Sequence, residues 1–178
     1  MKVFIDTNGF LSFYDMSNED IEELKKLVVL VEQGEVELIL TDQIVDEFYR
    51  NRESKIRESI QALKKGGIDL RLPAPTMKYP EHQQIQEHLR ELSELKQATL
   101  RAFEEDAKNN TLPADIVIKK LIEVGTRIEV DQEIIDCVQD RDFRGNPPGK
   151  NGSKGDAINW ECLLRHFGNT KDDIVIVS

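Results

Sequence analysis

Short apolar runs alternate with amphipathic stretches over the first third of the chain. Lys2–Ile5 and Val36–Leu40 are apolar runs of strand length, and turn-forming residues follow the first of them. Apolar residues at helical spacing predict a helix over Ser17–Gln33 and another that begins after Thr41. A last apolar run, Ile174–Val177, predicts a buried strand.

The middle of the sequence has a different pattern. Gly66-Gly67 interrupts the long second helix, and the proline-rich segment Leu72–Pro80 predicts a loop. The charged stretch Glu81–Lys108 contains a narrow apolar stripe and predicts a helical hairpin that stands off the core. Further short helices are expected over Pro113–Gly125 and Asp131–Asp140.

The order strand, helix, strand, helix predicts an α/β fold with a parallel sheet and helices on its faces. The length of 178 residues fits a single domain over residues 1–178, with a helical insertion at about 54–130.

Composition and cysteine use place the protein in a broad class. With 39% hydrophobic and 33% charged residues, the chain has the balance of a soluble globular protein. No apolar run approaches the roughly 20 residues of a membrane helix, and the N-terminus does not resemble a signal peptide. Cys137 and Cys162 form no CxxC pair and are expected to be free thiols. We therefore expect a cytoplasmic protein without membrane association.

Three acidic residues lie where the predicted elements end or begin. Asp6 follows the first strand, Glu47 lies one to two turns into the helix after the second strand, and Asp156 begins the helix before the last strand. Ligands of open α/β sheets bind beyond the carboxyl ends of the strands, so the three carboxylates are candidates for one site. Taken singly, Asp6 is equally well explained as a turn former, whereas Glu47 is better explained as a solvated helix acid and Asp156 as a helix N-cap. Asp46 also competes with Glu47 for the role.

Carboxylates held close together repel one another unless a cation screens them. Mg²⁺ prefers oxygen ligands and needs only one or two carboxylates for each ion. Such an ion can activate a water and stabilise charge on a phosphodiester. The three acids therefore predict a metal site. His82, His88 and His166 show no ligand spacing, so zinc is not expected.

Three segments resemble the motifs of the PIN-domain nucleases, in the order that the family has them. Val3–Asn8 is similar to the opening motif, Thr41–Phe48 to the second and Gly155–Trp160 to the third. The Pro-Pro-Gly-Lys loop before the third motif is closer to a bacterial PIN-like subgroup with a long helical insertion. The resemblance covers both ends of the chain and hardly touches residues 54–139.

The resemblance implies a three-layer α/β/α nuclease that uses Mg²⁺ or Mn²⁺, held by Asp6, Glu47 and Asp156, to cleave RNA. Asn8 and Asn159 are polar neighbours of these acids and would hold waters around the metal. The family usually has a fourth acid just after the last strand. This sequence stops at Ser178, immediately before that position, and we expect it to be the N-terminal part of a longer protein.

Basic residues near the acids are candidates for phosphate contact. The net charge of −10 argues against general affinity for nucleic acid but is compatible with a local basic lip. The residues predicted to form that lip are Arg50, Arg52, Arg144, Lys150 and Lys154. The alternative is that the glycine-rich loop that carries Arg144, Lys150 and Lys154 is a flexible connection, and that Arg50 and Arg52 are solvated. Trp160 is expected in the core rather than as a base-stacking residue.

Three functions fit these features. The first is a metal-dependent endoribonuclease, compatible with a toxin of a toxin–antitoxin pair, a processing enzyme or a defence effector, and with a homodimer. The second is a catalytically weak or inactive binding module that docks a protein partner through Leu89, Leu92 and Leu95 of the insertion. The third is a phosphatase-like or receiver-like domain with Asp6 as nucleophile, which the absence of a second acid beside Asp6 disfavours.

Overall fold

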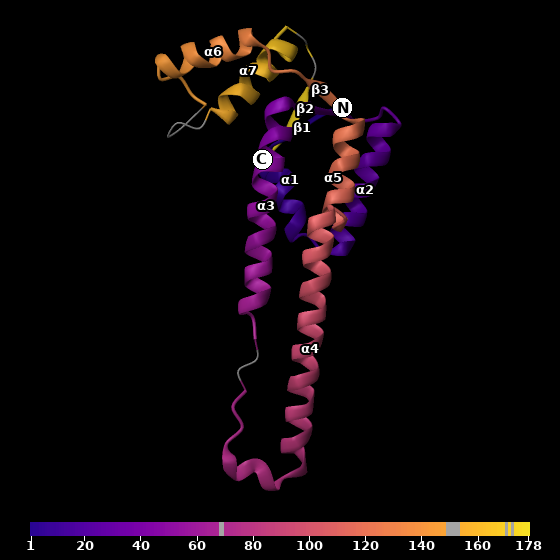
Figure 1. Cartoon of the computed structure of the whole chain (residues 1–178). Coiled ribbons are helices and arrows are strands. Elements are labelled where there is room, and N and C mark those ends of the chain that lie inside the picture. The colour runs from indigo at the N-terminus through magenta and orange to yellow at the C-terminus, as the bar shows by residue number, and fades with distance from the viewer. Residues whose placement is uncertain (68–69, 149–153, 170, 172) are drawn as a thin grey trace. The chain divides into compact units, whose positions relative to one another are not determined.

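A parallel sheet forms the centre of the fold. The computed structural model describes residues 1–67, 70–148, 154–169, 171 and 173–178. Within these residues four strands, β1 (Lys2–Ile5), β2 (Glu37–Thr41), β3 (Thr126–Ile128) and β4 (Ile174–Val177), lie in the order β3-β2-β1-β4 (Figure 1). All three pairings are parallel, as the alternation of strands and helices predicted.

The strands at the centre of the sheet are apolar because helices bury them on both faces. Val3, Phe4 and Ile5 of β1 are buried, and Leu38–Leu40 of β2 is fully inaccessible. β3 was not predicted. It has three residues, two of them exposed, and its pairing with β2 is what identifies it as a strand.

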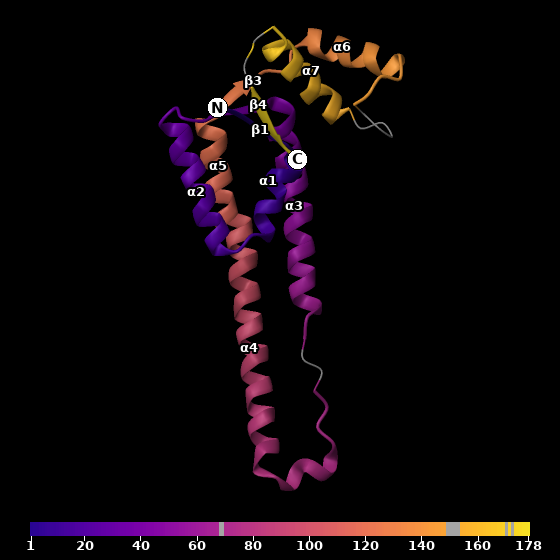
Figure 2. The ribbon, with the colours of Figure 1, turned by 180° about the vertical axis from the view of Figure 1, so that it is seen from behind.

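The helices that surround the sheet form two visible pairs. The helical elements of this part of the chain are α1 (Thr7–Ser12), η1 (Phe13–Asp15), α2 (Asn18–Glu32), α3 (Asp42–Lys65), α5 (Pro113–Val124), α6 (Gln132–Phe143) and α7 (Gly155–Phe167). α2 lies beside α5, and α6 lies beside α7 (Figures 1 and 2). Apart from α1 and η1, which replace a predicted turn, each of these helices was expected from the sequence. The α/β class is therefore confirmed.

Residues Lys55–Leu112 form a second compact unit, and the remainder of the chain forms the first. The second unit contains the end of α3, the short η2 (Ala74–Lys78) and α4 (Pro80–Asn109). α4 is one continuous helix, so the hairpin predicted within Glu81–Lys108 is wrong. The unit ends at Leu112, and α5, which follows it, lies beside α2 in the first unit.

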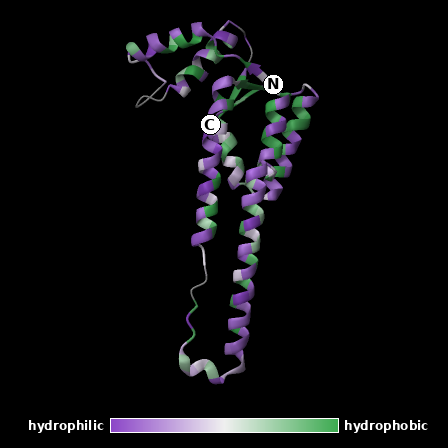
Figure 3. Cartoon of the chain, viewed as in Figure 1, coloured by the Kyte–Doolittle hydropathy of each residue, from purple (hydrophilic) through white to green (hydrophobic). Residues whose placement is uncertain are grey.

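Polar contacts hold the two arms of the second unit together. The ammonium of Lys96 on α4 donates to the carbonyl oxygens of Lys64 (3.1 Å) and Gly66, and thereby caps the C-terminus of α3. Lys64 pairs with Glu104 at 2.7 Å. α4 is mostly hydrophilic, in contrast to the strands (Figure 3). Among the described residues, no helix combines the length and the apolar character needed to cross a membrane.

A buried ion pair joins α3 to α5 in the first unit. Arg52 donates from Nε to Asp115 Oδ1 at 2.7 Å and from Nη2 to Oδ2 at 2.5 Å, and both residues are buried. The hydroxyl of Tyr14 also donates to Asp115 and accepts from Arg52 Nε at 3.2 Å. Burial, together with the bond to Asp115, raises the pKa of Tyr14 well above its ordinary value, so the phenol remains protonated.

Removal of one partner leaves the other charge buried without compensation. We expect Asp115→Ala to lower the free energy of unfolding by about 3–5 kcal/mol. The double variant Arg52→Met, Asp115→Leu should regain most of this loss, because it removes both charges and keeps the volume. Urea unfolding followed by circular dichroism measures both effects. Equal destabilisation by the single and the double variant would contradict the assignment.

The two cysteines differ in burial and should differ in reactivity. Cys162 is buried, and this burial raises the pKa of its thiol to about 11, whereas Cys137 is exposed. The thiolate is the reacting form, and at pH 8 about one Cys162 thiol in 10³ is ionised. Iodoacetamide at pH 8 should therefore modify Cys137 alone in the folded protein and both cysteines in urea. Mass spectrometry counts the adducts, and two adducts on the folded protein would refute the prediction.

Candidate functional site

Asp6 lies at the point where the strand order of the sheet reverses. The chain goes from β1 to β2 and β3 on one side of β1 and then returns to β4 on the other side. The amide of Asp6 donates to the carbonyl oxygen of Val177 at 2.8 Å, which joins the carboxyl ends of β1 and β4. Asp6 is extended and half-buried, and α1 begins directly after it. Its carboxylate thus stands where open α/β sheets bind ligands.

Glu47 lies against the first turn of α7. A Cβ atom added to Gly155 would be 3.1 Å from Glu47 Oε2 and 3.0 Å from Gln43 Nε2. Because residue 155 is glycine, this turn can approach the Glu47 carboxylate closely, and Asp156 is the next residue. Gln43 Nε2 donates to Glu47 Oε2 at 3.4 Å, whereas Asp46 is exposed. Of the two acids that competed at the sequence level, Glu47 is therefore the one beside α7.

A buried polar link fixes α7 to the end of β2. The hydroxyl of Thr41 donates to Asn159 Oδ1 at 2.6 Å and accepts from the amide of Ile44 at 3.2 Å. The same hydroxyl thereby caps the start of α3 and binds α7. Asn159 was predicted to hold waters around a metal, and the structure gives its side-chain oxygen this anchoring bond. Asn8, exposed, donates to Asp6 Oδ2 over a long 3.5 Å.

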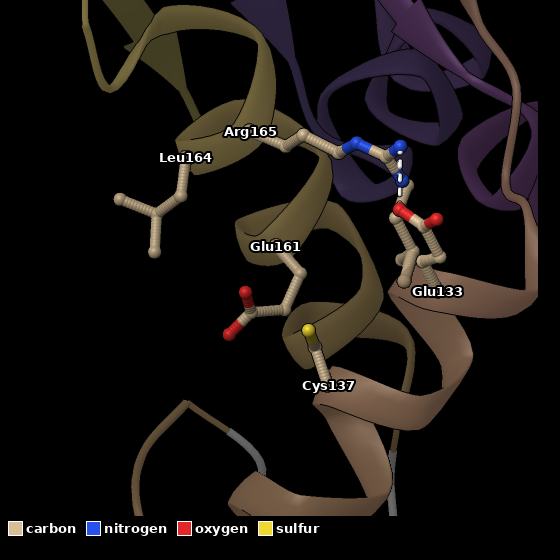
Figure 4. Close-up of a pocket in the computed structure, with 6 residues that line it drawn as sticks. Glu133, Cys137, Glu161, Leu164 and Arg165 are labelled. Atoms are coloured by element: carbon tan, nitrogen blue, oxygen red, sulfur yellow. Dashed lines mark ion pairs between the residues drawn. The ribbon is translucent and has the colours of Figure 1, made fainter.

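α6 and α7 are held together by ion pairs of their own. Arg141 pairs with Glu161, and Arg165 pairs with Glu133 at 2.8 Å across a pocket of about 290 Å³ (Figure 4). Figure 4 shows Leu164 pointing away from the Arg165–Glu133 pair. These contacts fix the orientation of α7, and with it the position of Asp156.

The sequence was compared with known protein families, and the model of a family described as PIN domain matches residues 3–178. The chain belongs to the PIN-domain family. No curated protein and no solved structure matches the chain at a significant level. PIN domains are generally metal-dependent nucleases that typically bind Mg²⁺ or Mn²⁺.

The acids of this PIN domain match such an ion in chemistry and in the elements that present them. Asp6 follows β1 and Thr41 ends the neighbouring β2, and the register that pairs Phe4 with Ile39 continues to these two residues. The hydroxyl of Thr7, next to Asp6, is buried and has no hydrogen-bond partner among the described residues. A polar group bound near Asp6 would satisfy it. The described residues nevertheless contain no group of three Asp, Glu, His or Cys side chains gathered closely enough to hold a metal.

The predicted basic residues fall into three groups. Arg50, Arg144 and Lys154 are exposed, and the last two pair with Asp140 (3.0 Å) and Asp142 (3.4 Å). Lys150 lies outside the described residues. Arg52 is the exception to the prediction. Its guanidinium is buried against Asp115, so it is a structural residue and does not face a phosphate.

A substitution at Gly155 should displace the Glu47 carboxylate. The atoms that a Cβ of Gly155→Ala would meet are the ends of flexible side chains, so we expect a change in stability of about 1 kcal/mol or less. If Glu47 is a ligand, the Kd for Mn²⁺ should rise about tenfold. Thermal unfolding and isothermal titration calorimetry measure the two quantities.

Gly67→Ala is the matched control for this substitution, because a Cβ there meets no atom within 4 Å. It should leave Mn²⁺ binding unchanged. Wild-type Mn²⁺ affinity in Gly155→Ala would remove Glu47 from the ligand set.

Proposed function

We propose that this PIN domain is a Mg²⁺- or Mn²⁺-dependent endoribonuclease that uses Asp6, Glu47 and Asp156. The observation that carries the proposal is the close approach of Gly155, the residue before Asp156, to the Glu47 carboxylate. Asp6 follows β1, the strand next to β2, at the point where the strand order of the sheet reverses. When bound, the divalent ion would activate a water and neutralise charge on the phosphodiester.

The protein residues around the acids have positioning roles in this proposal. Thr41 and Asn159 hold α7 on β2, and the Asp6 amide holds β1 to β4. Asp6, Glu47 and Asp156 would then be presented to the ion by three separate elements of the fold. Such preorganisation is what a metal site needs from the groups around its ligands.

Single phosphates of the RNA would be held by exposed cations. Arg50 lies one turn beyond Glu47, and Lys154 immediately precedes the Gly155-Asp156 turn. Because the protein as a whole is strongly acidic, we propose a small number of phosphate contacts rather than a broad basic surface. Specificity for RNA would then depend on contacts with bases and on the shape of the strand.

The direct test is Asp6→Asn, which keeps the shape of the side chain and removes its charge. We expect cleavage of a single-stranded RNA in Mn²⁺ to fall by at least about 10²-fold, with an unchanged unfolding transition. Asp46→Asn is the control, because Asp46 is an exposed acid adjacent to Glu47. This variant should cleave the RNA at the wild-type rate. Cleavage that continues in excess chelator would rule out the metal-dependent mechanism.

A binding module remains the second candidate, and one observation favours it. Leu63, Leu89, Leu92 and Leu95 line a groove of about 630 Å³ in the second unit, and Leu92 and Leu95 are exposed. An apolar helix of a partner protein would cover these leucines. A calorimetric titration with Mn²⁺ separates the two functions: absence of binding at millimolar Mn²⁺ favours the module, and saturable binding favours the nuclease.

A further inference from the structure

The two edges of the sheet differ in their protection against pairing with another strand. β3, at one edge, has three residues, and its Arg127 pairs with Asp42. Asp42 also accepts from the amide of Val130, shortly after β3, at 3.1 Å. Short length and charged side chains are features that keep an edge strand from pairing with another chain. The edge at β3 is therefore protected by its own residues.

β4, at the other edge, has no charged side chain. Its sequence Ile-Val-Ile-Val also contains no proline and no glycine. This segment was predicted to be a buried strand, but Val175, Ile176 and Val177 are 46%, 50% and 43% exposed. Adjacent residues of a strand point to opposite faces of the sheet, so β4 has exposed apolar side chains on both faces. An apolar, uncharged edge strand of this kind is a surface on which another strand can pair.

The backbone of β4 has hydrogen-bonding groups that face away from the sheet. Among the described residues β4 pairs only with β1, and the carbonyl oxygen of Val177 accepts from the Asp6 amide at 2.8 Å. The N–H and C=O groups of a strand alternate in direction from one residue to the next. Val175 and Val177 therefore bond to β1, whereas Ile174 and Ile176 direct their groups to the open edge. β4 can receive a further strand and keep its bonds to β1.

We propose that β4 pairs in the antiparallel sense with β4 of a second copy of this chain, with the twofold axis at Val175. In this register Ile174 faces Ile176 of the partner subunit, and these residues exchange main-chain hydrogen bonds. Asp173 faces Val177 of the partner subunit, so no like charges meet. The sheets of the two copies would become one continuous sheet.

A second copy is favoured over another protein because β4 is its own complement. A twofold dimer uses the same surface on both subunits, and the open edge of β4 meets this condition in the antiparallel sense. The cross-strand pairs would join β-branched aliphatic side chains, which pack well on a pleated surface. β4 has no polar or charged side chain for which a different partner would supply the opposite group.

The proposed dimer keeps the two candidate sites apart. Antiparallel pairing places the carboxyl ends of the two β4 strands at opposite ends of the interface. Asp6 lies at the carboxyl end of β4, because its amide bonds to Val177. The Asp6 residues of the two copies would therefore lie on opposite edges of the joined sheet. The dimer is independent of the proposed nuclease function, and either proposal can fail without the other.

Sedimentation equilibrium of the chain tests the dimer. Four residues on each side form a small interface, so we expect a concentration-dependent dimer between about 10 μM and about 1 mM. Ile176→Lys places a charge on the edge and should raise the Kd of the dimer at least about tenfold. Ile116→Lys is the matched control, because Ile116 of α5 is 58% exposed in the same unit. It should dimerise as the wild type does, and circular dichroism checks that both variants fold.

A cross-link tests the register without weakening the interface. Val175 would face the same residue of the partner subunit in a pair without hydrogen bonds, with Cα atoms about 4.5 Å apart, which a disulfide can span. Cys137→Ser leaves only the buried Cys162 as a native thiol. In that background, Val175→Cys should give a disulfide-linked dimer when copper phenanthroline oxidises the thiols. Ile176→Cys should link far less, because residue 176 faces residue 174 and not its own equivalent.

Three results would overturn the pairing of β4. The first is a monomer at all concentrations up to about 1 mM. If the Ile176 amide of that monomer is protected from hydrogen exchange, another segment of the same chain covers the edge. The second is a dimer that Ile176→Lys leaves unchanged, which would place the interface elsewhere. One such surface is the outer face of α7, where Trp160, expected in the core, is 40% exposed and Leu164 is 42% exposed. The third is equal weakening by Ile176→Lys and Ile116→Lys.

Discussion

The hydrogen bonds of the Thr41 hydroxyl are the contact on which the candidate site depends. This fully buried group ends β2, caps α3 through the amide of Ile44 and holds Asn159 of α7. The relative position of Glu47 and Asp156 follows, because each lies within two turns of a residue that Thr41 binds. A buried hydroxyl with both its donor and its acceptor satisfied orients its partners sharply, since any shift would leave a polar atom without a partner.

Some charged side chains of this PIN domain form ion pairs that hold its elements together, and others are exposed to solvent. Arg52 and Asp115 neutralise each other inside the first unit, with Tyr14 completing the hydrogen bonds. Arg141 and Arg165 are engaged in holding α6 against α7. Arg50 and Lys154, which are close in sequence to Glu47 and Asp156, remain exposed. Two such cations agree with the small number of phosphate contacts proposed for a protein of net charge −10.

Glycine and the aromatic residues give α7 two distinct faces. Gly155 allows the helix to approach Glu47, and the buried residues of the same helix complete the core over the sheet. The opposite face leaves Trp160 and Leu164 in solvent, where a core helix would have polar residues. The same helix thus contributes an acid to the proposed metal site and leaves an aromatic ring in solvent.

The sequence by itself determined the local features. Apolar periodicity and boundary residues placed β1, β2, β4 and most helices, because these signals depend on neighbours in the chain. The three motifs placed Asp6 after β1, Glu47 within the second turn of α3 and Asp156 at the start of α7. Features that depend on residues distant in the sequence were decided only by the tertiary structure. β3 exists through its pairing with β2, Arg52 is buried because Asp115 faces it, and Glu47 rather than Asp46 meets Gly155. Trp160 is exposed because no element of the described residues covers it, and no pattern within α7 itself records this.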